Sequence, residues 1–581
     1  MRSAVNKGTA SKPRARPRGR SRERVWLAVA LALLLVLTAG WSLPASAADE
    51  PSGAMPEATP ELLEQGRETY VKRCSFCHGL LGDGEGPAAE FLDPRPRDFT
   101  LGVFKFRTTG SGELPIDEDM FRTVSRGLPG TGMQAFDDGR IKNGLSEQQR
   151  WAVIAYIKTF VPEFDDPEFD PYKKIVSLPA NRPASSEGLV AKGREVFERA
   201  KCWECHGKEG RGNGQKAFDR KDDWGFPIRI RNVTFPWKIK GGSEAEDIFM
   251  RFSTGINGTP MPSFIKALGE DERWALANFI KSLQHQLTEH QVLKALKVDG
   301  DIPIAADDPQ WAGAEAMDVR LAGQVVAAPR WQNPSIEMVT LRAIYNDQEI
   351  AFLAWWDDPF EDVTHVVENE FDPNELRVVG GYNSYVQPYD MVPRQLENFR
   401  DSVALQFPAK PPKGTAKPHF FRGTSSEPTN LWIWRADREA AGETSVEEAT
   451  ARGWKQAAKA QPEDQQQVSG QAVWADGRWS VVMKRPLVTE DKADVQFIEG
   501  RFIPLAVNAW DGSNGEHGMM MSLSTWHFVT LEAPMPWTVY LYAVIAMLVA
   551  GALGFLLTWL ANREKKPQNE DEDEDEAGAE A

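Results

Sequence analysis

Cysteine is scarce in this sequence, which has 4 cysteines in 581 residues. All four fall in two copies of one pattern, Cys74-Ser-Phe-Cys-His78 and Cys202-Trp-Glu-Cys-His206, so none remains for a disulfide or a separate reactive thiol. A zinc site built from two Cys pairs usually has them about 15–20 residues apart, much closer than these. The sequence therefore contains two self-contained motifs, each ending in a histidine.

Positive charge and the common catalytic patterns are also in short supply. The chain has 84 acidic and 67 basic residues and a net charge of −17, which disfavours nucleic acid and favours basic redox partners. No Ser/His/Asp triad, carboxylate pair or phosphate-binding loop stands out from the background. The two Cys/His motifs are thus the part of the sequence in which chemistry is expected.

Two thiols separated by two residues and followed at once by a histidine form the attachment pattern of haem c. Each thiol can form a thioether bond to the porphyrin, and the histidine then binds the iron as its proximal ligand. The sequence therefore predicts two covalent haems c, attached at Cys74, Cys77, Cys202 and Cys205 and bound through His78 and His206.

Two methionines complete the predicted iron sites. Met133 follows His78 by 55 residues, Met261 follows His206 by the same 55, and both lie in loops rich in glycine or proline. A lone methionine is usually core filling, but this repeated spacing indicates a ligand. We expect His/Met ligation of both irons, which leaves no coordination position open and raises the reduction potential.

The two motifs belong to a duplicated unit. A helical pattern precedes each motif, a glycine-rich loop and the methionine loop follow it, and a last helix closes the unit at 147–160 and again at 270–283. This order resembles a small class I cytochrome c domain. The resemblance implies two mainly α domains, residues 60–162 and 187–284, joined by a linker rich in Pro, Asp and Glu.

Basic residues recur at equivalent places in the two units, and two interpretations of them stay open. Their charge suits the carboxylates of haem propionates, but it also suits a solvated face. The pairs are Arg97 and Arg231, Lys105 and Lys238, and Arg107 and Lys240.

Apolar runs lie near both ends of the chain. A basic segment, an apolar run and Ala45-Ser-Ala47 predict a secretory signal peptide, residues 1–47. Residues 537–560 carry no charge and predict a transmembrane helix about 36 Å long. Arg563 and the lysines after it place the acidic tail, residues 561–581, in the cytoplasm and the haem domains on the periplasmic side of a bacterial inner membrane.

Residues 284–300 extend the helical pattern as a connector. From about residue 300 this pattern gives way to short alternating runs. Turn residues separate these runs, which predict an all-β sandwich. The expected strands are 338–345, 350–356, 402–407, 430–434, 478–484, 502–510 and 526–531.

Sequence motifs in this part carry a second resemblance. They are Asp308-Pro-Gln-Trp311, Ile350 to Asp358, Phe399 to Pro408, Ala506 to Gly512 and Ser522 to Trp526. Together they resemble the haem b subunit family related to the γ subunit of ethylbenzene dehydrogenase, over residues 296–533. The resemblance implies a β-sandwich that holds one haem b, typically between Met and Lys, and that passes electrons for molybdenum enzymes of the dimethylsulfoxide reductase type.

The chain departs from that family at both haem b ligands. Leu405-Gln406 stands where the family Met is expected, and Met519-Met-Met521 stands where the family Lys is expected. Met521 is the first candidate for a haem b iron ligand, and His517 and His419 are alternatives. A third, non-covalent haem and a haem-free sandwich used for docking both stay open.

Together these features predict a membrane-anchored periplasmic multihaem cytochrome that relays electrons and has no catalytic residue of its own. The resemblance implies a molybdopterin oxidoreductase as one partner, with a carrier such as soluble cytochrome c as another. Two hypotheses remain beside it. One is a cytochrome subunit of a quinol-oxidising cytochrome b/Rieske complex, and the other is a ligand-binding sandwich with cytochrome redox partners.

Overall fold

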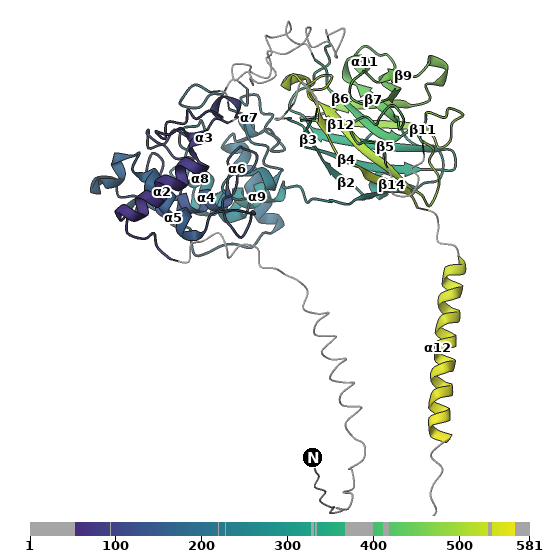
Figure 1. The fold of residues 1–581 in the computed structure, drawn as a ribbon, viewed down its shortest axis with the longest axis horizontal. Coiled ribbons are helices and arrows are strands. Elements are labelled where there is room, and N and C mark those ends of the chain that lie inside the picture. Colours follow the sequence, from purple (N-terminus) through teal and green to yellow (C-terminus); the bar gives the residue numbers. More distant parts are fainter. Residues whose placement is uncertain are drawn as a thin grey trace, which may run out of the picture.

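The computed structural model describes residues 53–563 except 93, 219, 227, 327–330, 332–333, 366–398, 411–416 and 533–536. The predicted signal peptide and most of the predicted tail lie outside these residues. The described chain forms a helical lobe, a β-sheet lobe and a separate helix, in that order along the sequence (Figure 1). This layout confirms the predicted fold class.

The helical lobe repeats one arrangement of four helices. The first unit has α2 (Pro60–Arg73), α3 (Ser75–His78), α4 (Asp117–Arg126) and α5 (Glu147–Lys158). The second unit has α6 (Glu187–Arg199), α7 (Trp203–His206), α8 (Ala245–Thr254) and α9 (Glu270–Ser282). The closing helix α5 begins with a capping box, in which the Ser146 hydroxyl accepts from the Gln149 backbone and the Gln149 side chain accepts from the Ser146 backbone.

Glycine permits a close crossing of the first and last helices of each unit. A Cβ on Gly66 would lie 2.1 Å from the carbonyl oxygen of Ala152, and a Cβ on Gly193 would lie 2.1 Å from that of Ala275. Because no other residue fits this space, α2 packs on α5 and α6 packs on α9 with their backbones nearly in contact. Each crossing fixes where the next motif, α3 or α7, begins.

The β lobe contains fourteen described strands in one hydrogen-bonded sheet. Eleven of them follow the order β10-β11-β5-β4-β1-β14-β12-β6-β7-β8-β9, and β2, β3 and β13 pair beside this path. The strands are β1 (Val292–Lys297), β2 (Met317–Arg320), β3 (Ala322–Gly323), β4 (Met338–Tyr345), β5 (Glu349–Asp357), β6 (Ser402–Pro408), β7 (Thr429–Arg435), β8 (Val446–Ala451), β9 (Lys459–Ala460), β10 (Ser469–Trp474), β11 (Arg478–Pro486), β12 (Phe502–Trp510), β13 (Ser522–Leu523) and β14 (His527–Leu531).

This path folds into two layers that share one apolar core. Side chains of β4, β5 and β11 meet those of β6, β7 and β12. The ring of Phe352 lies 5.7 Å from that of Trp432, and the ring of Trp356 lies 6.0 Å from that of Trp434. The face-to-face packing confirms the predicted sandwich, and each of the predicted strands is present.

One segment differs from its prediction. Residues 284–300, expected to continue as a helical connector, contain β1. This strand pairs in parallel with β14 over its first four residues and with β4 over its last two, so it joins the two layers of the sandwich. Leu293 and Ala295 point into the core. Pairing with strands distant in the sequence overrides the local helical pattern here, and local patterns do not reveal such pairing.

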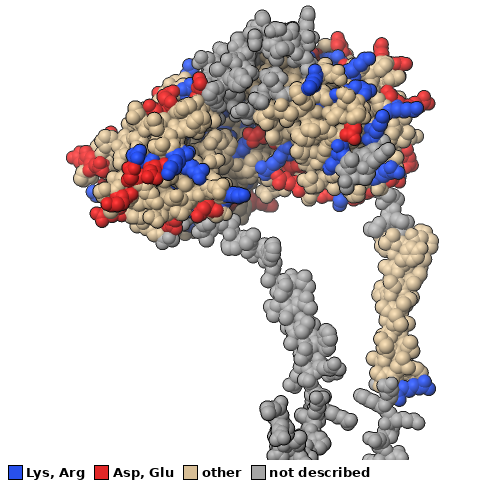
Figure 2. All heavy atoms as spheres, in the orientation of Figure 1, with Lys and Arg blue, Asp and Glu red and all other residues tan. Residues whose placement is uncertain are grey.

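The last described helix, α12 (Trp537–Arg563), stands apart from both lobes (Figure 1). It includes a window with a mean hydropathy of 2.3 that is not buried in the protein, within residues Trp537–Ala561. A helix of 25 residues spans about 38 Å, enough to cross a bilayer. In Figure 2 the surface of this helix is free of charge except for basic atoms at its lower end, and Arg563 is the basic residue of its last turn. The helix is therefore a candidate membrane span, in agreement with the predicted 537–560.

Replacing Gly66 by alanine is expected to destabilise the first unit, because the new methyl group would need the space of the Ala152 carbonyl oxygen. Overpacking of this kind costs about 1–3 kcal/mol, which urea unfolding followed by circular dichroism would detect. Gly188→Ala in α6 is the control, since a Cβ there meets nothing within 4 Å. Equal stability of the two variants would contradict the close helix crossing.

Candidate haem sites

The histidine of the first motif is held by the backbone. His78 Nδ1 lies 2.9 Å from the carbonyl oxygen of Arg97. Because a carbonyl only accepts, Nδ1 carries the proton and Nε2 keeps the lone pair that a metal requires. Phe99 stacks on the imidazole with ring centroids 4.6 Å apart. Burial lowers the pKa of His78, so the ring is neutral at pH 7.

The histidine of the second motif has the same surroundings. His206 Nδ1 lies 3.2 Å from the carbonyl oxygen of Arg231, and burial again lowers the pKa of the imidazole. The turn after each motif also repeats. Gly84 N donates to the carbonyl of His78 at 2.9 Å, and Gly212 N donates to that of His206 at 2.8 Å. Each motif and the glycine-rich loop after it therefore form one structural unit.

The first cysteine of each motif is packed against the core of its unit, Cys74 in the first and Cys202 in the second. Burial raises the pKa of Cys74 to about 12 and that of Cys202 to about 11, and it also raises the pKa of Cys77. These thiols are therefore uncharged at neutral pH. A bound metal would itself deprotonate such thiols, so the histidine after each pair and the wide spacing of the pairs, and not these pKa values, favour thioether bonds over a zinc site.

Met133 lies in a loop braced by a threonine. The Thr131 hydroxyl donates to the carbonyl of Leu128 at 2.8 Å and accepts from the backbone N–H of Met133 at 3.1 Å. The loop begins at Gly127, which has a φ of 67° and lies so close to the returning part of the loop that a Cβ would be 2.5 Å from the nitrogen of Ala135. These constraints hold the half-buried Met133 against the core of the first unit.

Met261 lies in a second loop of the same design. The Thr259 hydroxyl donates to the carbonyl of Ile256 at 2.8 Å and accepts from the backbone N–H of Met261 at 3.3 Å. Gly255, with a φ of 70°, begins this loop as Gly127 begins the other. The structure thus brings both predicted methionines into matching, half-buried positions beside their cores.

A buried arginine behind each methionine loop was not predicted from the sequence. Arg150 donates to the Ser125 hydroxyl at 2.5 Å and lies over the ring of Phe121, which packs on Trp151. The second unit repeats these contacts with Arg273, Ser253, Phe249 and Trp274. Equivalent residues of the two units are 128 positions apart in α4 and α8, but only 123 apart in α5 and α9. A comparison of the two units that allowed this shorter spacing would have paired Arg150 with Arg273.

The sandwich places the first haem b candidate in a packed environment. Met521 is fully buried in an apolar cluster, and its sulfur accepts from Arg422 Nη2 at 3.7 Å. Gln406, at the position of the family Met, is also buried and donates to the carbonyl of Phe420 at 2.6 Å.

The two histidine alternatives differ in burial. His517 is buried, donates from Nδ1 to the carbonyl of Gly515 at 2.8 Å and stacks on Phe399 at 3.9 Å. His419 is exposed, and its Nδ1 accepts from the backbone N–H of Phe421. A haem b ligated by Met521 stays a prediction, as do the alternatives His517 and His419.

The matches to known protein families divide the chain at the same place as the structure does, between the helical lobe and the β lobe. The cytochrome c family matches residues 63–160 and 190–284, and the ethylbenzene dehydrogenase family matches residues 308–461 and 450–522. The chain contains two cytochrome c domains followed by an ethylbenzene dehydrogenase-type domain. The cytochrome c domains imply haem c, and their two thiols, neutral imidazole and methionine fit that group.

Relatives of this chain include haem subunits. A protein described as a respiratory nitrate reductase haem subunit, from Haloferax mediterranei, is 27% identical over 43% of this chain and 79% of its own length. The γ subunit of dimethylsulfide dehydrogenase from Rhodovulum sulfidophilum is 28% identical over 24% of this chain, but over only 52% of its own length. A chain of the reducing HAO-like protein complex of Kuenenia stuttgartiensis is 43% identical over 38% of this chain and 96% of its own, with a TM-score of 0.36. The relatives support a role as an electron-transfer cytochrome.

The two cytochrome c domains contact each other through one of the recurring basic residues. Arg107 is fully buried, and its guanidinium donates to the carbonyls of Thr254 at 2.9 Å and Gly255 at 3.5 Å in the second domain. In return, Arg251 donates to the carbonyl of Arg107 at 3.1 Å. Arg107 is neither part of a solvated basic face nor free to bind a haem propionate, because it is buried and its donors bind backbone carbonyls. It joins the domains.

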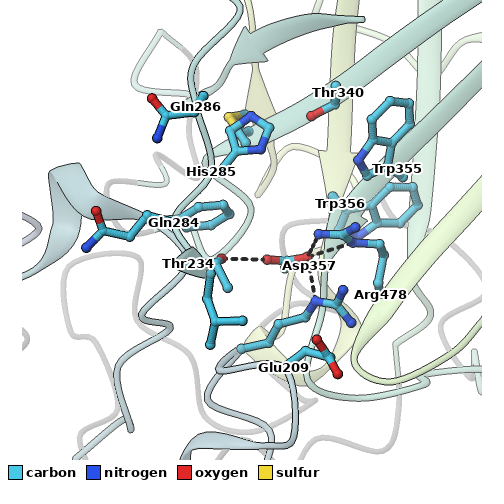
Figure 3. A pocket seen from close by; sticks show the side chains of 14 residues that line it. Glu209, Thr234, Gln284, His285, Gln286, Thr340, Trp355, Trp356, Asp357 and Arg478 are labelled. Atoms are coloured by element: carbon cyan, nitrogen blue, oxygen red, sulfur yellow. Dashed lines mark hydrogen bonds and ion pairs between the residues drawn. The ribbon is translucent and has the colours of Figure 1, made fainter. Parts of the chain in front are cut away.

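The second cytochrome c domain also contacts the sandwich, beside a polar cleft of about 370 Å³ (Figure 3). Asp357, at the end of β5, lies at the centre of this interface. It pairs with Arg478 of the sandwich at 2.8 Å and with Arg211 of the cytochrome domain at 3.4 Å, and it accepts from Asn232 at 2.9 Å. Sequence reasoning found the motif that contains Asp357 but could not find its partners, which lie over a hundred positions away.

A cluster of carboxylates lies at one end of the sandwich. Oxygen atoms of Asp358, Asp362, Asp401 and Asp511 lie within 4.8 Å of one another. Asp401 accepts from the Trp479 indole and the Gly512 backbone, so hydrogen bonds within the fold stabilise it. Burial and the neighbouring negative charges raise the pKa of both Asp358 and Asp401 well above the usual range. Burial and Asp511 likewise raise the pKa of nearby Glu516 to about 7.

The free energy of unfolding of the sandwich is expected to fall as the pH rises from about 4 towards these raised pKa values. The folded protein binds more protons than the unfolded chain in that range, so raising the pH favours unfolding. Urea unfolding followed by tryptophan fluorescence at pH 5 and pH 8 measures the effect. Asp358→Asn should be the more stable form at pH 8 and should weaken the dependence. A flat profile in the parent protein would mean that the carboxyls stay ionised.

Proposed function

We propose that this chain is a membrane-anchored electron-transfer protein in which two covalently bound haems c relay electrons between a redox enzyme and a second carrier. The observation that carries the proposal is the repeated donor set, with a carbonyl-bound imidazole and a threonine-braced methionine in each domain. In this proposal Cys74, Cys77, Cys202 and Cys205 attach the haems. The iron ligands are His78 with Met133 and His206 with Met261.

When bound, each haem would supply a one-electron centre. The residues of the chain orient and enclose it. The hydrogen bond from Nδ1 to a carbonyl fixes each imidazole, and the threonine brace fixes each methionine. The apolar cores beside both sites exclude water. Held by a histidine and a methionine, each haem would supply electron transfer and would leave no iron position for a substrate.

Contacts between the two domains favour transfer from one site to the other. Arg107 binds the carbonyls of Thr254 and Gly255, where the Met261 loop begins. Arg97, whose carbonyl accepts from His78, also places its guanidinium 4.0 Å from the ring centroid of Trp224 in the second domain. Residues that position both proposed irons therefore belong to one interface, which would keep the distance between them fixed.

The purified protein should carry two covalent haems, because both attachment motifs are complete. The mass of the intact protein checks this count. Replacing Cys74 and Cys77 by serine should remove one haem mass, and replacing Cys202 and Cys205 should remove the other, so each variant controls for the second. A pyridine haemochrome assay after acid extraction separates any non-covalent haem b from haem c. One covalent haem, or none, in the parent protein would contradict the proposed relay.

We further propose that the redox enzyme is a molybdopterin oxidoreductase on the extracytoplasmic side. Relatives named as a nitrate reductase haem subunit and a dimethylsulfide dehydrogenase subunit support this choice. The predicted signal peptide would export the domains, α12 would anchor them, and the basic residues from Arg563 onwards favour a cytoplasmic C-terminus. Extraction in mild detergent should retain a molybdenum-containing subunit, measured by metal analysis of the purified complex. A co-purifying Rieske protein would instead favour the quinol-oxidising alternative.

A further inference from the structure

The first cytochrome c domain exposes large apolar side chains around its attachment motif. Phe76, Leu80 and Leu81 are 65%, 67% and 72% exposed. They lie within six residues of one another in the sequence, on either side of Cys77 and His78. Single exposed apolar residues are ordinary, but three together beside a proposed redox centre call for an explanation.

The second domain provides an internal comparison, because its backbone repeats at this place. Gly79 and Gly207 have the same φ of 75°, and the loops after them make the same hydrogen bonds to the motif histidines. At the offset of 128 the three apolar residues correspond to Glu204, Lys208 and Glu209. One surface of the duplicated unit is therefore apolar in the first copy and charged in the second.

In the second domain the sandwich covers the loop that follows these counterparts, whereas Lys208 itself is exposed. Arg211 pairs with Asp357 and donates to the carbonyl of Asp476 at 2.7 Å. Phe218 packs on Phe360 with ring centroids 4.4 Å apart. The covered copy is thus the more polar one, and the apolar copy faces solvent. Packing among the described residues leaves these apolar side chains exposed, and contact with another molecule would account for them.

Charge around the apolar residues indicates what kind of molecule fits. The loop that carries Leu80 and Leu81 continues with Asp83, Glu85 and Glu90, of which the last two are exposed. The counterparts of these acids in the covered copy are Arg211, Asn213 and Phe218, none of them acidic. The pairing of Glu85 with Arg95, at 3.4 Å on the surface, neutralises little of this charge. The surface therefore has an apolar centre and an acidic edge.

We propose that Phe76, Leu80 and Leu81 form the docking surface on which a small soluble redox protein exchanges electrons with the first cytochrome c domain. This proposal rests on the electron-transfer function proposed above. The partner has an apolar contact area surrounded by Lys and Arg, which the acidic edge and the net charge of −17 attract. The first domain is then the external connection of the relay, and the second domain is the internal one.

The test measures the second-order rate constant of electron exchange between the detergent-solubilised full chain and a basic mitochondrial cytochrome c as the probe. The parent protein should react rapidly, with a rate that falls as ionic strength rises. Leu80→Ser with Leu81→Ser should lower the rate constant at least tenfold at every ionic strength. Glu85→Lys with Glu90→Lys should lower it mainly at low salt and flatten the salt dependence.

Val488→Ser is the matched control, because Val488 is an apolar residue of the sandwich that is 65% exposed and should not affect exchange. Haem content and reduction by dithionite show that each variant is folded and loaded. A leucine variant that reacts like the parent overturns the docking proposal and leaves the relay intact, as does a parent that is reducible but does not react with the probe. A concentration-dependent dimer that the leucine variant abolishes would assign the surface to a second copy and also overturn the proposal. Absence of covalent haem in the parent would instead reject the proposed function itself.

Discussion

The hydrogen bond from each motif histidine to a backbone carbonyl is the constraint on which the helical lobe depends. It selects the imidazole tautomer, and it ties the motif to a segment about twenty residues further along the chain. In the first domain that segment also reaches outward, because the Arg97 side chain lies over Trp224 of the second domain. The position of a proposed iron ligand and the contact between domains therefore depend on the same few residues.

The two cytochrome c domains share their interior and differ at their surface. Both copies keep the glycine crossing, the threonine-braced loop and the buried arginine, which are the features that shape the interior. They differ where the glycine-rich loop meets its surroundings, since in the second copy Arg211 of this loop contacts the sandwich, and Leu80 and Leu81 of the first copy are exposed among the described residues. The interior of the unit is thus common to both copies, and the surface determines what each copy connects to.

Much of this organisation could be predicted from short-range patterns. The two Cys-x-x-Cys-His motifs, the equal spacing to Met133 and Met261, and the alternating strands are all written in nearby residues. The features that escaped prediction depend on contacts between distant parts of the chain. Arg107 was recognised as a recurring cation, but its carbonyl partners lie nearly 150 positions away. Likewise, β1 is a strand only because β4 and β14 flank it.

The pairing of β1 with β14 also has a mechanical consequence. Strand β14 ends at Leu531, shortly before α12, and β1 begins at Val292, shortly after the second cytochrome c domain. The two strands are hydrogen-bonded neighbours that run in the same direction. The shortest connection from the anchor helix to the helical lobe therefore runs through one pair of adjacent strands. Together with the contact of Arg211 with Asp357, this connection would set the height and tilt of the cytochromes above a bilayer.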